Sequence, residues 1–249
     1  MRNLVRNYTI AGGGKSVEVP IYANVSAAAV NEATDLSNTA INPTSVTITA
    51  SEVGIMTTLT DLARNSASRN VAADIRRLFG EAIARKVDAD LSALFTGFST
   101  ERGGGAGNEL TVQDLFEAAA DLRTANAPAP YYGVFHPKQI FNVKKSLTNT
   151  FVGRDTELSN EAMRSGFVGN IAGIQIFESS NISVDGSDDS IGGVFSQDAL
   201  ALAMMQDLKI ESQRDASLRA DELVATAVFG VSEIHDSYGV KLTADSLAN

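Results

Sequence analysis

VAADIRRLFGEAIARKVDADLSALF, residues 71–95, carries the strongest structural signal in the sequence. Its apolar residues recur at intervals of three and four, at Val71, Ile75, Leu78, Phe79, Ala82, Ile83, Val87, Leu91, Leu94 and Phe95. This spacing predicts one long helix with a single buried face. We expect it to begin at Ser68 or Asn70 and to end at Gly97, with Glu81 and Arg85 as an exposed pair. At about 1.5 Å per residue the helix would be roughly 40 Å long.

Downstream of this helix the pattern alternates irregularly between helix and strand. Thr111 is expected to begin a second amphipathic helix, in which Asp114 completes a capping box. The remaining predicted elements are the strand YYGVF (131–135), a helix after Pro137, the strand GIQIF (173–177), a turn at Asp185-Gly186, a short helix SQDALALAMM (196–205) capped by Ser196, and strands at 208–213, 223–231 and 239–244. No βαβ repeat is present in this order, so the predicted class is α+β.

Upstream, the sequence predicts an extended arm over residues 1–15 and then a long hairpin. Residues 16–23 alternate apolar and polar side chains, and Pro20 places this strand at a sheet edge. Residues 45–60 form a second β-rich stretch, with a long polar segment between the two. Because an isolated two-stranded hairpin is marginal in water, this one is either disordered or ordered by contacts outside its own domain.

The composition is that of an ordinary globular protein: 249 residues, 44% hydrophobic and 20% charged. No apolar run approaches the roughly 20 residues of a membrane span, and the N-terminus lacks the apolar core of a signal peptide, so the protein is expected to be cytoplasmic. The absence of cysteine excludes disulfides and thiolate sites. The net charge of −10 argues against a DNA-reading surface.

The charge is unevenly placed along the chain. Residues 16–63 contain five acids and no base, and Arg64, Arg69, Arg76 and Arg77 follow them. Two interpretations remain open: solvated faces of one subunit, or complementary patches on different copies of the chain.

No catalytic, cofactor or metal-binding residue is predicted. AGGGKS (11–16) lacks the first glycine of a phosphate loop, because position 9 is Thr, and a strand pattern follows it. His136 is most simply a cap or a packed side chain, and VDGSDD (184–189) lacks calcium-loop spacing. His235, between Glu233 and Asp236, leaves a small α+β hydrolase as an alternative from a different class.

Four segments, taken in order, resemble the major capsid proteins of tailed bacteriophages with the Hong Kong 97-type fold. They are residues 60–97, GVFHPKQ (133–139), GNIAGIQIFESSNI (169–182) and residues 194–215. The resemblance implies an N-terminal arm (1–15), an extended E-loop (16–60), a peripheral domain with the spine helix (61–107), an axial domain (108–203), return strands of the peripheral domain (204–230) and a C-terminal strand of the axial domain (231–249).

The resemblance also implies a structural protein and not an enzyme. Such proteins assemble into pentamers and hexamers that close an icosahedral head around double-stranded DNA, which is bound non-specifically. The implied location is the virion after assembly in the host cytoplasm, without a membrane. The implied partners are further copies, a scaffolding protein, a portal and, where the head carries one, a decoration protein. The runner-up is an encapsulin-type nanocompartment shell.

Two departures from the family pattern bear on assembly. The arm is short, so scaffolding is expected from a separate protein or from a removed segment. The E-loop contains no lysine, which excludes the lysine–asparagine cross-link of some relatives. For the contact between subunits we expect Glu32 and Asp35 of one copy to face the arginines of a neighbour, Arg64, Arg69, Arg76 and Arg77.

Overall fold

The computed structural model describes residues 1–246 except residues 12, 23, 24, 26, 28, 32–39, 67–69 and 152–168, and it leaves out the side chains of 146–151. The helical elements are η1 (Arg2–Leu4), α1 (Asp61–Ser66), α2 (Val71–Ala93), η2 (Leu94–Gly97), α3 (Val112–Thr124), α4 (Pro137–Phe151) and η3 (Asp236–Tyr238). The strands are β1 (Arg6–Thr9), β2 (Ser16–Ile21), β3 (Thr44–Thr49), β4 (Ser51–Thr60), β5 (Glu101–Arg102), β6 (Tyr131–Phe135), β7 (Asn170–Ile171), β8 (Ile174–Glu178), β9 (Asp189–Ser196), β10 (Leu200–Asp215), β11 (Ala220–Glu233) and β12 (Gly239–Asp245).

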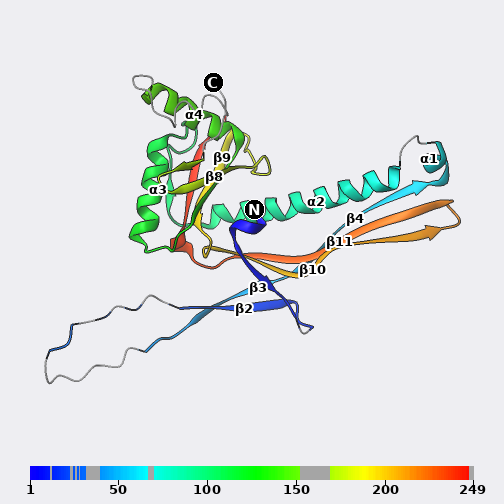
Figure 1. Ribbon diagram of the computed structural model, residues 1–249, viewed down its shortest axis with the longest axis horizontal. Coiled ribbons are helices and arrows are strands. Elements are labelled where there is room, and N and C mark those ends of the chain that lie inside the picture. The colour runs from blue at the N-terminus through cyan, green and yellow to red at the C-terminus, as the bar shows by residue number, and fades with distance from the viewer. Residues whose placement is uncertain are drawn as a thin grey trace.

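The predicted long helix is confirmed as α2, which runs alongside the long strands β10 and β11 (Figure 1). The Asn70 side chain caps it by accepting a hydrogen bond from the Ala73 amide. Its apolar stripe is buried at Phe79, Ile83, Val87 and Leu91. With 23 residues and about 1.5 Å per residue, α2 is ~35 Å long, and η2 then continues to Gly97.

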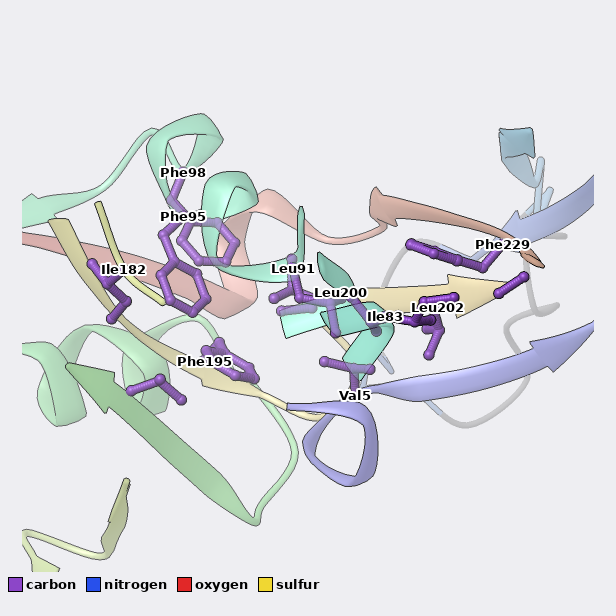
Figure 2. Close-up of a cluster of buried hydrophobic side chains, with 14 of the residues drawn as sticks. Val5, Ile83, Leu91, Phe95, Phe98, Ile182, Phe195, Leu200, Leu202 and Phe229 are labelled. Atoms are coloured by element: carbon purple, nitrogen blue, oxygen red, sulfur yellow. The ribbon is translucent and has the colours of Figure 1, made fainter. Parts of the chain in front are cut away.

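Under α2 lies a four-stranded sheet in the order β1-β10-β11-β4. β10 and β11 form a long antiparallel pair, β1 joins β10 in parallel, and β4 joins β11 antiparallel. The principal core between α2 and this sheet contains Ile83, Leu91, Leu200, Leu202 and Phe229 (Figure 2).

The prediction of a short helix over residues 196–205 is wrong, because the strand β10 begins at Leu200. Leu200 and Leu202 point into the core under α2, whereas Ala201 and Ala203 point into a second core on the opposite face. A strand buried on both faces reads as a continuous apolar run without alternation. The predicted cap, Ser196, instead donates a hydrogen bond to the carbonyl of Pro128 at 2.6 Å.

The predicted hairpin exists, but its second arm is shorter than expected. β2 and β3 pair from Ser16↔Thr49 to Ile21↔Thr44, which puts Pro20 on an edge strand as predicted. The following strand, β4, pairs with β11 and so belongs to the four-stranded sheet. Val19 and Ile48 pack into the second core of the same chain. The base of the hairpin is therefore ordered by its own subunit, and the need for outside contacts applies only to the part beyond it.

A six-stranded sheet, in the order β5-β12-β9-β6-β8-β7, forms the other half of the molecule together with α3 and α4 (Figure 1). The predicted capping box of α3 is confirmed, with Thr111 and Asp114 bonded reciprocally. The predicted strands at 131–135 and 239–244 and the helix after Pro137 are also present. No helix among the described residues is long and apolar enough to cross a membrane.

The two halves meet where η2 ends and where β9 passes into β10. Phe95 and Phe98 of this region are fully buried, and the ring centroid of Phe95 lies 5.5 Å from that of Phe195 on β9 (Figure 2). Because α2 leads directly into η2, this aromatic cluster fixes α2 relative to both sheets.

Candidate assembly surfaces

The hairpin beyond β2 and β3 exposes apolar side chains that its own chain does not cover. Tyr22 is 61% exposed, Val25 62%, Val30 49% and Ile41 56%. The two strands lie at the opposite end of the four-stranded sheet from α1 (Figure 1). A grouping of large exposed apolar side chains on an extended segment is typical of a surface that another molecule covers.

The four arginines predicted for the contact between subunits differ in their surroundings. Arg64 forms an ion pair with Asp221, and Arg77 forms one with Glu81 at 2.7 Å. The expected pair of Glu81 with Arg85 is therefore wrong, since Glu81 turns toward the other neighbour on the helix. Arg76 is exposed and has no ion pair within the described part of the chain. Arg69, Glu32 and Asp35 lie outside the described residues, so their pairing stays a prediction.

A compact ion-pair cluster joins α1 to the far end of the β10–β11 pair. Arg214 donates to both carboxylate oxygens of Asp61 at 2.6 and 2.7 Å and also contacts Asp221 at 3.2 Å. The hydrogen bonds from Arg214 lower the pKa of Asp61. In this position α1 leaves Leu62 80% exposed, and Leu218, between β10 and β11, is 59% exposed. Asp221 of this cluster also pairs with Arg64, one of the arginines predicted for contact with a neighbour.

A groove of about 430 Å³ runs between β4 and α2. Its walls are Ile55, Met56 and Thr57 on the strand and Ile75, Leu78, Phe79, Glu81, Ala82 and Arg85 on the helix. Leu78 is 52% exposed and Met56 60% exposed, so the apolar walls face solvent. Sequence reasoning missed this groove, because its two walls come from segments that are separated along the chain.

The two histidines and the acidic turn at Asp185 contact neighbouring groups of the same chain. The amide of Lys138 donates to Nδ1 of His136 at 3.4 Å, which agrees with the predicted capping role at the start of α4. The ring of His235 packs against that of Tyr238, with centroids 4.7 Å apart and the planes tilted by 33°. Burial lowers the pKa of both histidines. The carboxylate of Asp185 accepts the amides of Ser187 and Asp189, as expected for a turn.

Comparison with known proteins agrees with the resemblance found in the sequence. Residues 43–241 match the family described as phage capsid protein. No curated protein matches the chain.

Solved structures of phage heads are similar over nearly the whole chain. The capsid protein of cyanophage P-SCSP1u is 20% identical, with a TM-score of 0.74 over 97% of this chain and 86% of that one. The head of Helicobacter pylori bacteriophage KHP40 gives 14% identity and a TM-score of 0.75 over 98% and 88%. Microbacterium phage Oxtober96 gives 14% identity and a TM-score of 0.75 over 98% and 90%.

These likenesses confirm the predicted α+β fold of the Hong Kong 97 type. The family match covers most of the sequence and includes α2, the long strand pair β10 and β11, and the six-stranded sheet except for the end of β12. The chain therefore belongs to the phage capsid protein family.

Proposed function

We propose that this major capsid protein assembles head to tail into the pentamers and hexamers of an icosahedral phage head, which encloses double-stranded DNA. The main support for this proposal comes from the hairpin. Its base is held by its own subunit, while Tyr22, Val25 and Ile41 remain exposed beyond it. A contact between two different surfaces generates rings, whereas a contact between identical surfaces stops at a dimer. The family match favours a phage head over an encapsulin-type shell.

The remaining expectations about partners follow from this role. Assembly in the host cytoplasm would draw on a scaffolding protein and a portal. With a net charge of −10, the subunit would hold the packaged DNA through few and non-specific contacts. The protein would act as a structural component and not as an enzyme, as the match to the phage capsid protein family favours.

The direct test is the size of the expressed protein. Sedimentation and electron microscopy should show large closed particles with fivefold and sixfold capsomers. A protein that stays monomeric under all conditions, including with the phage's own scaffolding protein, would contradict the proposal. Obligate interfaces of this type bury more than about 2,000 Å², so the assembled state should be strongly favoured.

Charge complementarity supplies a second test of the same proposal. We expect Arg76→Glu with Arg77→Glu to impair assembly and Glu32→Arg with Asp35→Arg to restore it in part. Arg76 should contribute most, because Arg77 already pairs with Glu81. Exposed pairs are worth only about 0.2–1 kcal/mol each, so each single change should be mild. Normal assembly of the double arginine variant would show that these charges do not guide docking.

A further inference from the structure

Within the described residues, the chain crosses between the two halves of the molecule at three places. Residues 98–100 lead from η2 to β5, residues 197–199 lead from β9 to β10, and residues 234–238 lead from β11 to β12. The amide of Ile234 donates to the carbonyl of Ala199 at 2.8 Å, so a backbone hydrogen bond joins the second crossing to the third. The contacts among these crossings therefore determine how firmly the two sheets are held together.

Two acidic side chains join the third crossing to the first. Asp236 accepts the Ser99 amide at Oδ1, at 2.7 Å, and the Ser99 hydroxyl at Oδ2. Glu233, at the end of β11, reaches the same segment, because a Cβ added at Gly97 would lie 2.7 Å from its Oε2 atom. Glycine at position 97 thus leaves the space that the Glu233 carboxyl occupies. The same carboxyl lies within hydrogen-bonding reach of Asp236.

The ionisable groups around these crossings divide into two sets. In the first set, burial of Glu233 and, after it, the charge and hydrogen bond of Asp236 raise the pKa of Glu233. The second set consists of His235, Asp198 and Arg6. Arg6 donates to Asp198 at 2.5 Å, and both of these charges act on the imidazole of His235. The charged group with which the ionisation of Glu233 is coupled is therefore Asp236.

A proton shared by Glu233 and Asp236 would change their contact from repulsion to attraction. Two neighbouring carboxylates repel each other, whereas a proton on one of them allows a hydrogen bond. The protonated Glu233 carboxyl would donate to Asp236, which would continue to accept from Ser99. Because the pKa of Glu233 is raised in the folded subunit, this contribution to stability is present in acid and is lost as the pH rises through the raised pKa.

We infer that Glu233 and Asp236 form a proton-dependent contact between residues 97–99 and 233–236, which holds the two halves of the subunit together more firmly in mild acid than at neutral pH. The inference accounts for Gly97, whose missing side chain admits the Glu233 carboxyl, and for Ser99, which offers both of its donors to Asp236. It concerns the single subunit, so its test is independent of the proposed shell function.

Hydrogen exchange of the Ser99 amide measures this contact, because the acceptor of that amide belongs to Asp236. Mass spectrometry of short peptides from unassembled subunits would follow the exchange from about pH 4.5 to about pH 7.5, with correction for the pH dependence of the intrinsic rate. Since exposed interactions between charged groups are weak, protection in acid should be about two- to fivefold greater than at neutral pH. His235→Gln should show the same rise, because removal of the imidazole leaves the carboxyl pair unchanged.

Matched variants of Glu233 separate the contact from a general effect of pH. Glu233→Gln carries an amide that can donate to Asp236 at every pH, so protection of Ser99 should be high and independent of pH. Glu233→Ala should give low protection that is also independent of pH. Glu222→Gln, the same change earlier on β11, should behave as the wild type does. Wild-type protection that does not change with pH, or a pH dependence that persists in Glu233→Gln, would overturn the inference.

Gly97→Ala tests the geometry without changing either acid. The added Cβ would displace the Glu233 carboxyl, which is the flexible end of a side chain, so the subunit should still fold. Protection of Ser99 in acid should then fall to its value at neutral pH. Circular dichroism and thermal unfolding would confirm that each variant folds. If Gly97→Ala retains the greater protection in acid, Glu233 does not act through this contact and the inference fails.

Discussion

Replacement of Phe95 by Ala should lower the free energy of unfolding of the subunit by about 3–5 kcal/mol. The ring is fully buried, with centroids 5.5 Å from Phe195 and 6.3 Å from Phe98 (Figure 2). It also lies against the backbone of β9, since a Cβ added at Gly193 would be 2.6 Å from its Cδ1 atom. A strand backbone cannot move in to fill the space that the ring leaves, so the loss should fall in the upper part of this range.

The loss should be measured by calorimetry and urea unfolding of unassembled subunits. For a chain of this size each kcal/mol corresponds to roughly 2–4 °C in Tm, so the variant should melt roughly 6–20 °C lower. Phe116→Ala is the matched control: it is the same chemical change on α3, where the side chain is 56% exposed. Its effect should stay within about 0.5 kcal/mol. Equal losses for the two variants would refute the conclusion that Phe95 ties α2 to both sheets.

Three further predictions concern covalent links and pH. Mature particles boiled in detergent should give one band near 26.2 kDa, because the chain has no cysteine and residues 16–63 have no lysine; a ladder of heavier bands would contradict this. Burial and the nearby Asp236 raise the pKa of Glu233 above its usual 4.5, so the folded state loses stability as the pH rises from 4.5 through that raised pKa. Glu233→Gln should therefore be more stable than wild type at neutral pH and lose this advantage below about pH 4.5, as urea midpoints over a pH series would show. Burial lowers the pKa of His136 and His235 below 6.5, so stability falls as the pH drops through and below 6.5. The double change to Gln should reduce this loss while particles still form, and an unchanged pH profile would show that neither histidine contributes to it.

Several elements could be predicted from the sequence because they depend on neighbours in the chain. The stripe from Ile75 to Leu91 predicts α2 since residues three and four apart share a face of a helix. The capping box of Thr111 and Asp114 is likewise a contact across three residues. The four segments that resemble phage capsid proteins are also visible in the sequence, and it was these segments that led to the correct fold family.

Other features depend on parts of the chain that meet only after folding. The run from Leu200 to Ala203 favours a helix by composition, yet it is a strand, because separate cores cover its two faces. Residues 45–60 divide at Ala50, whose amide donates to the carbonyl of Lys15 at 2.7 Å. Gly230 of β11 passes so close that a Cβ there would lie 2.3 Å from the carbonyl oxygen of Thr49.

The candidate contact surfaces show the same division between local and distant causes. An arginine is recognisable in the sequence, but whether Arg64 remains available depends on Asp221, which approaches it only in the folded subunit. The groove beside β4 exists because β11 holds that strand at one edge of the sheet while α2 covers the rest. Local periodicity in the sequence thus determines the helices and strands. Their packing determines which strand edges and charged side chains stay exposed, because each surface is buried by segments that are distant in the sequence.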